Sequence, residues 1–217
     1  MIYSHILFDL DGTLVDSSVG IYHSYVEALR LFEREISLEV LQSKIGPPVA
    51  EAFKELFPDL FLDPKNLRKV LRGQRKYYRS KGVFESKVYP NIVIMLETLK
   101  KRGKILCVAT SKPTVFAKKI LEHQNLSHYF DVIIGSTLNL SRTKKTDVIA
   151  AVLKKFSNIP PEKIVMIGDK KHDIEGAAAH KIDSIGITYG YGSYEEIEKS
   201  KPTYVSNTAL GLLDILN

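Results

Sequence analysis

Two aspartates one residue apart stand where a short apolar run ends. Asp9 and Asp11 follow the run 6–8, and Gly12-Thr13 come directly after them. Alternate residues of a strand point to the same side, so both carboxylates can face one pocket at the carboxyl edge of a sheet, where open α/β sheets bind ligands. Like charges that close repel unless a cation or a shared proton intervenes. The pair therefore predicts a metal site, an acid/base pair, or both.

Gly12 allows the backbone to turn sharply beside such a pocket, and Thr13 supplies a hydroxyl group, so both are candidate phosphate-binding residues. An ordinary acidic turn after a strand would have the same residue types. The functional interpretation therefore depends on whether later segments add chemistry at the same edge of the sheet.

A second group of polar residues, Thr110-Ser111-Lys112, ends the apolar run 105–109 and precedes Pro113. Hydroxyl groups at a strand end, followed by the free amides of a helix N-terminus, suit phosphate oxygens, so Thr110, Ser111 and Lys112 are candidate phosphate-binding residues. Serine and threonine are also common helix caps, so this signal is weak by itself.

A lysine stands where the helix after the apolar run 132–134 is expected to begin. The helix dipole disfavours a cation at that position, and a negative cluster near Lys145 would explain its presence. Lys144 is the competing assignment, and a solvated surface lysine is the plainer alternative.

The apolar run 164–167 ends in Gly168-Asp169, and Asp173 follows four residues later near the first turn of the next expected helix. Carboxylates from two strand ends suit Mg²⁺, which keeps several waters and takes few protein ligands. His172 has no metal-ligand spacing and is expected to be exposed or a minor substrate contact.

The elements that must position these residues alternate in type along the chain. Short continuous apolar runs between helical patterns are typical of parallel strands buried on both faces. We therefore expect an α/β protein with a doubly wound parallel sheet, a Rossmann-like core. Its strands are expected at residues 6–8, 105–109, 132–134, 164–167 and 184–187.

The interval between the first two strands is too long for one crossover helix. Helices are expected from Ser17 or Ser18 to about Glu35, over 49–56, and from the Asp63-Pro64 cap to about Ser80, with Gly82 as a stop. This predicts a catalytic core of residues 1–16 and 88–217 and an inserted helical cap of residues 17–87.

Composition sets further bounds on this chain of 217 residues. The net charge is +6, and the basic stretch 65–81 is interpreted as a solvated helix face that attracts anionic small molecules, not as a nucleic-acid site. The single cysteine, Cys107, lies in an apolar run, and a chain without an intramolecular disulfide suits a reducing cytoplasm. No apolar run is long enough to span a bilayer, so no membrane partner is expected.

Together these residues resemble the haloacid-dehalogenase-like superfamily of phosphotransferases. The resemblance covers essentially the whole chain, and its motifs are Asp9-x-Asp11-Gly12-Thr13, Thr110, Lys145 and Gly168-Asp169-x-x-x-Asp173. Phe8–Val15 and the segment 185–192, with Tyr189-Gly190-Tyr191-Gly192, are similar to the phosphoglycolate-phosphatase-like group. Relatives in that group include 5'-nucleotidases and pyrophosphatases.

The resemblance implies a role for each motif. Asp9 would be the nucleophile, Asp11 the general acid and base, and Thr110 and Lys145 would hold phosphoryl oxygens. Mg²⁺ would lie between Asp9, the backbone carbonyl of Asp11, and Asp169, with Asp173 in support. Ser111 stands where relatives often have asparagine, and Asn91 where they often have glycine.

The substrate and the oligomeric state are left open by the sequence. We expect the substrate to be a small phosphorylated metabolite that Arg75 of the cap helps to recognise. We expect the protein to be either a monomer or a homodimer. A phosphomutase of the β-phosphoglucomutase type is the main alternative, followed by a pyrophosphatase and a catalytically silent binding protein. A haloalkanoate dehalogenase has no use for Asp11 or for Mg²⁺.

Overall fold

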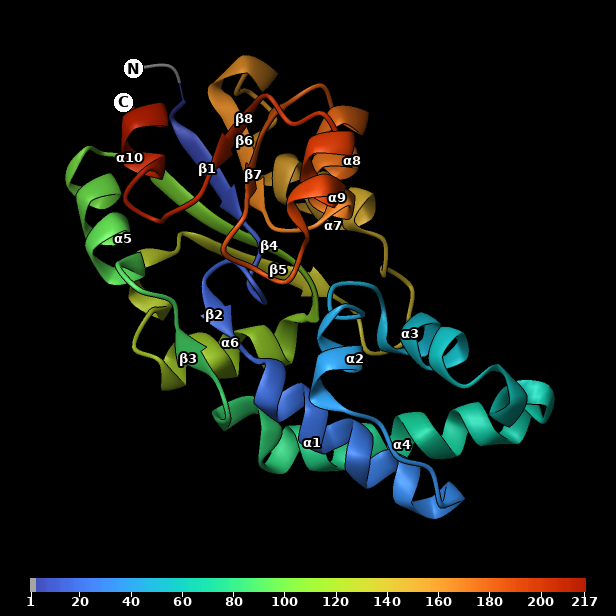
Figure 1. Ribbon diagram of the computed structural model, residues 1–217. Helices are drawn as coiled ribbons and strands as arrows, with labels where there is room; N and C mark the ends of the chain where they lie inside the picture. The colour runs from blue at the N-terminus through green and yellow to red at the C-terminus, as the bar shows by residue number, and fades with distance from the viewer. Residues whose placement is uncertain (1–2) are drawn as a thin grey trace. The chain divides into compact units, whose positions relative to one another are not determined.

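The computed structural model describes residues 3–217, so residues 1 and 2 of the expected segment 1–16 lie outside the described part of the chain. The chain forms two compact units. The core unit holds residues 3–16 and 88–217, and the inserted unit holds residues 17–87. Each unit is described by itself (Figure 1).

The core unit is built on a six-stranded sheet with the order β5-β4-β1-β6-β7-β8. All five strand pairs are parallel. This confirms the expected doubly wound α/β class. The strands are β1 (His5–Phe8), β4 (Ile105–Pro113), β5 (Val132–Ser136), β6 (Ile164–Gly168), β7 (Asp183–Ile187) and β8 (Tyr204–Ser206).

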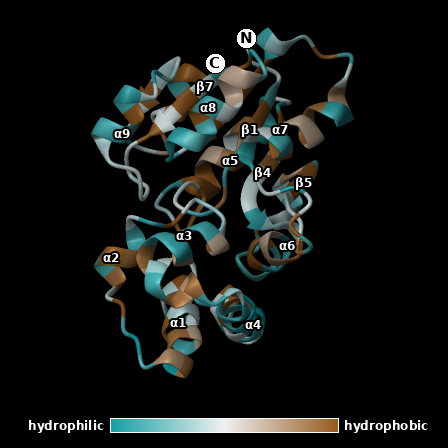
Figure 2. Cartoon of the chain, turned by 90° about the vertical axis from the view of Figure 1, so that its right-hand side faces the viewer, coloured by the Kyte–Doolittle hydropathy of each residue, from teal (hydrophilic) through white to brown (hydrophobic). Residues whose placement is uncertain are grey.

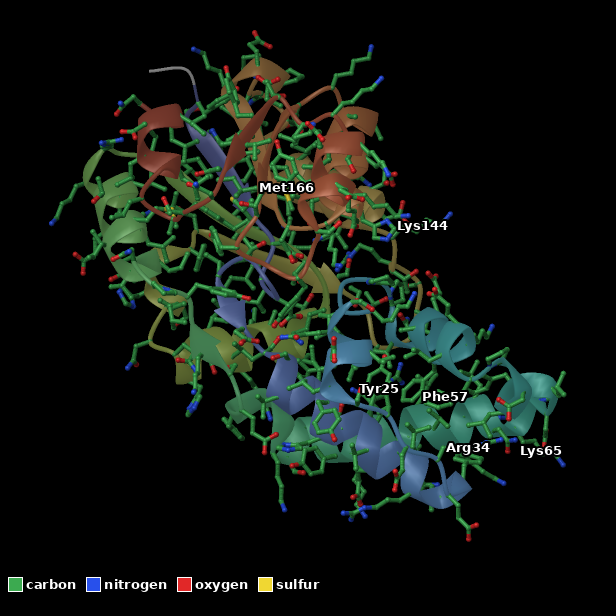
Figure 3. All side chains as sticks on the ribbon, viewed as in Figure 1. Tyr25, Arg34, Phe57, Lys65, Lys144 and Met166 are labelled. Atoms are coloured by element: carbon green, nitrogen blue, oxygen red, sulfur yellow. The ribbon has the colours of Figure 1, made fainter. Side chains whose placement is uncertain are left out.

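The central strand β1 is buried along its whole length, which explains its continuous apolar sequence. On one face, Leu7, Cys107 and Met166 pack with α7 (Lys145–Leu153) and α8 (Lys171–Ala179). Met166 lies in the interior of the core unit in Figure 3. Figure 2 shows β1 in the brown of apolar residues.

The remaining α-helices of the core unit are short. Asn91, at the N-cap of α5, has the left-handed φ of 64° that glycine would adopt easily. The expected tolerance of asparagine at this position agrees with that backbone. These helices are α5 (Ile92–Lys101), α6 (Thr114–His123), α9 (Tyr194–Lys199) and α10 (Leu212–Ile215).

The inserted unit is mainly helical, and its α-helices are α1 (Ser18–Leu29), α2 (Leu38–Gln42), α3 (Val49–Leu56) and α4 (Pro64–Ser80). Its interior is an apolar cluster in which the rings of Tyr25 and Phe53 stack with centroids 4.0 Å apart. As expected, α4 begins with proline, and the side chain of Asp63 accepts a hydrogen bond from the Lys65 amide at 2.8 Å.

Several expected boundaries were wrong. The first inserted helix ends at Leu29, a 3-10 turn follows, and Glu33 then takes a left-handed φ of 52°. The end of α4 at Ser80 agrees with the prediction, and Gly82, two residues later, begins a 3-10 turn. Strand β4 continues past the expected end at Ala109, with a shift of register between Thr110 and Pro113. Helix α2 and the edge strand β8 were not predicted.

Two short strands stand where the chain passes between its units. Strand β2 (Val15–Asp16) leads out of the core unit, and β3 (Lys87–Val88) leads back into it. The two strands pair as a separate two-stranded sheet. No helix among residues 3–217 has the length and apolar character that a membrane crossing requires.

Candidate active site

The sheet order brings the sequence-predicted residues to one edge. Asp9 follows β1, Asp169 follows β6, and Thr110 lies near the end of β4, the other neighbour of β1. Because the strands are parallel, their carboxyl ends meet at the same edge of the sheet. The Asp9 amide donates to the carbonyl of Ile167 at 2.9 Å, which continues the β1–β6 pairing beyond the strand.

Three of the expected carboxylates gather at this edge. Asp9, Asp169 and Asp173, here called the carboxylate triad, each offer an oxygen that lies within 4.8 Å of those of the other two. Asp9 is 5% exposed and the other two residues are fully buried. Carboxylates that are this close together and this well shielded from water repel one another strongly unless positive charge is supplied.

Lys145 supplies part of that charge. Its ammonium lies 2.9 Å from Asp9 Oδ1 and 2.8 Å from Asp173 Oδ1, and it donates a hydrogen bond to the carbonyl of Ala109 at 3.0 Å. Burial alone would lower the pKa of Lys145, but the two carboxylates outweigh burial and raise it, so the residue stays charged. Lys144 is exposed on the preceding loop (Figure 3), so Lys145 is the lysine that faces the triad.

The triad retains an excess of negative charge. Three carboxylates and one ammonium leave a net charge of −2 when all are ionised. Burial, followed by the charges of Asp173 and Asp9, raises the pKa of Asp169 to about 8. Burial also raises the pKa of Asp173 to about 6, although Lys145 opposes this. Full ionisation at neutral pH therefore requires further positive charge at this place.

The donor set fits a small divalent cation. Asp9 Oδ1 and Asp173 Oδ1 are both buried, and within residues 3–217 the Lys145 ammonium is the positively charged group that lies against them. Carboxylate oxygens are the ligands that Mg²⁺ prefers, and its charge would balance the −2 of the cluster. These residues could hold Mg²⁺, as the sequence predicted for Asp9, Asp169 and Asp173.

Asp11 has a different environment from Asp9. Its Oδ2 lies 2.8 Å from the ammonium of Lys112, and its carboxylate is not part of the triad. The expected contribution of Asp11 to a metal is through its backbone carbonyl, and that expectation stays a prediction. Lys112 was expected to bind phosphate, and in this structure it pairs with Asp11.

The turn after Asp9 is held against the triad. Gly12 has a φ of +82°, and a Cβ on this residue would lie 2.2 Å from Asp169 Oδ2, so only glycine fits. Thr13 donates its hydroxyl to Asp169 Oδ1 at 3.2 Å. Thr13 was expected to offer this group to phosphate, and in this structure it supports Asp169.

The other expected residues lie in three places. Thr110 is buried, with its hydroxyl accepting from the Lys112 amide at 3.2 Å, and Ser111 beside it is half-buried. His172 is half-buried near the start of α8, 3.8 Å from Glu175. Arg75 is on α4 of the inserted unit, so its role in substrate recognition stays a prediction.

One contributor was missed by the sequence. The backbone amide of Tyr191 donates to Asp169 Oδ2 at 2.8 Å. Every residue except proline has such an amide, so no residue type marks this contact. The closely spaced glycines and tyrosines at 189–192 were the available signal of a loop that packs tightly against the site.

Known proteins match almost the whole length of the chain. Residues 6–187 match the haloacid dehalogenase-like hydrolase family. A 5'-nucleotidase of Pseudomonas aeruginosa is 37% identical over 215 residues, which are 99% of this chain and 96% of that protein. A phosphoglycolate phosphatase of Vibrio cholerae is 33% identical over 221 residues, covering 97% and 96% of the two chains.

The fold has solved counterparts as well. The crystal structure of a predicted phosphatase from Clostridium acetobutylicum aligns with a TM-score of 0.93 and 40% identity, over 100% of this chain and 99% of that one. The chain belongs to the haloacid dehalogenase-like hydrolase family. Within that family it is a phosphatase.

Proposed function

We propose that this phosphatase hydrolyses small phosphomonoesters with the help of Mg²⁺, through an aspartyl-phosphate formed on Asp9. One observation carries the proposal: Asp9 lies with Asp169, Asp173 and Lys145 at the carboxyl edge of the sheet. In the proposal these residues supply the nucleophile, the cation ligands and a fixed positive charge.

The carboxylate triad would hold the Mg²⁺, with the backbone carbonyl of Asp11 as a further ligand. When bound, the ion supplies positive charge that offsets the repulsion between a phosphate dianion and an attacking carboxylate. Lys145 would contribute in the same sense, because its ammonium lies against both Asp9 and Asp173.

The reaction proceeds in two steps on the protein's own groups. In the first, a carboxylate oxygen of Asp9 attacks phosphorus, the ester P–O bond breaks, and Asp11 gives its proton to the leaving oxygen. In the second, Asp11 takes a proton from water, the water oxygen bonds to phosphorus, and the bond to Asp9 breaks to release phosphate. Lys112 contacts the Asp11 carboxylate, and this ionised form of Asp11 is the one that would take the proton from water in the second step.

The proposed substrate is a small anionic metabolite, of the phosphoglycolate or nucleotide type. Thr110 and Ser111 would contact phosphoryl oxygens beside the N-terminus of α6. Arg75 would help to recognise the rest of the substrate. The protein would work in the cytoplasm as a monomer or a homodimer, without a nucleic-acid or membrane partner.

The test is phosphate release from phosphoglycolate, nucleoside monophosphates, pyrophosphate and sugar phosphates, each with Mg²⁺ and with EDTA. We expect release that requires Mg²⁺ and is lost in Asp9→Asn, whereas the matched change Asp214→Asn, at an exposed aspartate on α10, retains it. Brief incubation with substrate should add one phosphoryl group to the wild-type protein by intact mass, and none to Asp9→Asn.

Two results would contradict the proposal. Turnover by folded Asp9→Asn at the wild-type rate would exclude Asp9 as the nucleophile. Conversion of a sugar phosphate into its isomer without phosphate release would indicate a phosphomutase of the β-phosphoglucomutase type instead.

A further inference from the structure

The loop after β7 lies directly on the carboxylate of Asp169. Besides the hydrogen bond from the Tyr191 amide, the backbone itself approaches closely. A Cβ on Gly190 would meet the Gly12 carbonyl oxygen at 2.3 Å and Asp169 Cβ at 2.4 Å. The absence of a side chain at Gly190 therefore lets this loop close over both the turn after Asp9 and the triad.

The other end of Tyr191 reaches a different part of the core unit. Its hydroxyl donates to Asp16 Oδ1 at 2.8 Å. Asp16 is the last residue of β2, after which the chain leaves the core unit. One half-buried tyrosine thus bonds to a triad carboxylate through its backbone and to the outgoing strand through its side chain.

The returning strand meets the same loop. Tyr89, which follows β3, donates its amide to the Leu14 carbonyl at 3.1 Å. Its ring also packs edge-on against Tyr189, with centroids 5.3 Å apart. The two connecting strands are therefore tied to the loop that covers Asp169.

We propose that Tyr191 is a positioning residue that couples the carboxylate triad to the β2–β3 connection. The inference rests on the proposed function only in that the triad is taken to bind Mg²⁺. Among residues 3–217, the carboxylate of Asp169 accepts hydrogen bonds from two groups, the Thr13 hydroxyl and the Tyr191 amide. The amide donor is held in place by the ring whose hydroxyl is anchored on Asp16, so release of that anchor loosens Asp169.

Coupling of this kind acts in both directions. If the Tyr191–Asp16 hydrogen bond strengthens Mg²⁺ binding, then bound Mg²⁺ must strengthen that hydrogen bond by the same factor. Mg²⁺ should therefore slow hydrogen exchange of the amides around Asp16 and Val88, although neither residue belongs to the triad.

The experiment measures Mg²⁺ affinity by titration calorimetry, which requires no turnover. Partners of metal ligands typically change metal affinity 10- to 100-fold, and the hydroxyl acts one step further out, so Tyr191→Phe should weaken binding about ten-fold. Asp16→Ala should have the same effect, and the double variant should be no weaker than either single one. Asp16→Asn retains an oxygen acceptor and should restore affinity close to the wild-type value.

The matched control is Tyr129→Phe, which removes a tyrosine–carboxylate hydrogen bond to Glu97 at the surface of the same unit. It should leave Mg²⁺ affinity and the exchange of residues 15–16 and 87–88 unchanged. For Tyr191→Phe, raising the Mg²⁺ concentration should restore phosphatase activity, which a misfolded site would not allow.

Wild-type affinity in both Tyr191→Phe and Asp16→Ala would overturn the coupling, as would fully additive losses in the double variant. If Tyr191→Phe does not fold, Asp16→Ala and Asp16→Asn decide alone. The proposed function and the coupling can fail separately. If no substrate releases phosphate, but Mg²⁺ binds and the single and double variants change its affinity as expected, the proposed function is refuted and the coupling stands.

Discussion

Lys145 is the residue on which the charge balance of the triad depends. Its ammonium is buried between Asp9 and Asp173 and is the cation that contacts both. Removal of one partner from a buried ion pair leaves uncompensated charge, at a typical cost of about 3–5 kcal/mol. Lys145→Met should therefore lower the free energy of unfolding in urea by this order when Mg²⁺ is absent.

The neighbouring lysine provides the control for this prediction. Lys144→Met changes an exposed side chain and should alter the free energy of unfolding by no more than about 0.5 kcal/mol. Mg²⁺ should reduce the loss in Lys145→Met, because it supplies charge at the same place. Equal stability of the two variants in EDTA would show that the triad does not need this ammonium.

Asp169 gives the metal-free protein a characteristic pH dependence. Its pKa is raised to about 8 and that of Asp173 to about 6, against about 3.9 for an aspartate in an unfolded chain. Between pH 4 and 8 the folded state then binds more protons than the unfolded state, so the free energy of unfolding in EDTA should fall as the pH rises.

Asp169→Asn tests the assignment of that slope. An amide carries no charge, can still accept the Tyr191 amide hydrogen bond, and should stabilise the metal-free protein at pH 8 while weakening Mg²⁺ binding. Thermal unfolding of wild type and variant in EDTA at pH 5, 6, 7 and 8 gives the comparison. If the variant is no more stable than wild type at pH 8, then ionisation of Asp169 does not destabilise the folded, metal-free protein.

At the scale of elements, helix α4 carries the net charge of the whole protein. It has seven basic residues and no acidic one, and outside it the chain has 24 basic and 25 acidic residues. Figure 2 shows α4 largely in teal. None of these cations forms a salt bridge to another residue within 3–217. The helix is therefore stabilised by its buried face and cap against its own repulsion.

A single charge reversal should relieve that repulsion. Lys69 is exposed and has Lys65 four residues before it and Arg72 three residues after it. Each such pair changes helix stability by about 0.2–0.5 kcal/mol, so Lys69→Glu should raise the urea midpoint at low salt. The gain should shrink at high salt because exposed charges are screened.

The control is the same lysine-to-glutamate substitution on another helix, at a position whose neighbour is acidic instead of basic. Lys118 on α6 is exposed and has Glu122 four residues after it, so Lys118→Glu replaces an attraction by a repulsion and should lower the midpoint slightly. An equal rise in both variants would point to net charge of the whole protein as the cause, and not to α4.

Across the whole molecule, the sequence predicted best those elements whose position depends on the residue types themselves. The continuous apolar runs predicted β1 and β6, and Asp63-Pro64 predicted the start of α4, because burial and capping act on the residues themselves. Strand β8 was missed because an edge strand with exposed Tyr204 and Val205 lacks an apolar run. The contact of Tyr191 with Asp169 was missed because it uses a backbone amide and depends on a fold that spacing alone does not give.

The division into two units makes a final prediction about where Mg²⁺ acts. All three triad residues belong to the core unit, whereas the apolar cluster around Tyr25 and Phe53 belongs to the inserted unit. A ligand at 100 times its dissociation constant stabilises the state that binds it by about 2.7 kcal/mol. Hydrogen exchange of buried amides in β1 and β6 should slow accordingly, and the effect should extend along the core chain to Asp16.

Amides of α1 and α4 should exchange at the same rate with and without Mg²⁺, because their packing lies within a unit that provides no triad ligand. Mass spectrometry of peptic fragments, with Asp169→Asn as the variant that lacks the response, separates the two units. Slower exchange of α1 and α4 to the same extent as β1 would show that both units unfold together, and the insertion would then be part of one cooperative structure with the core.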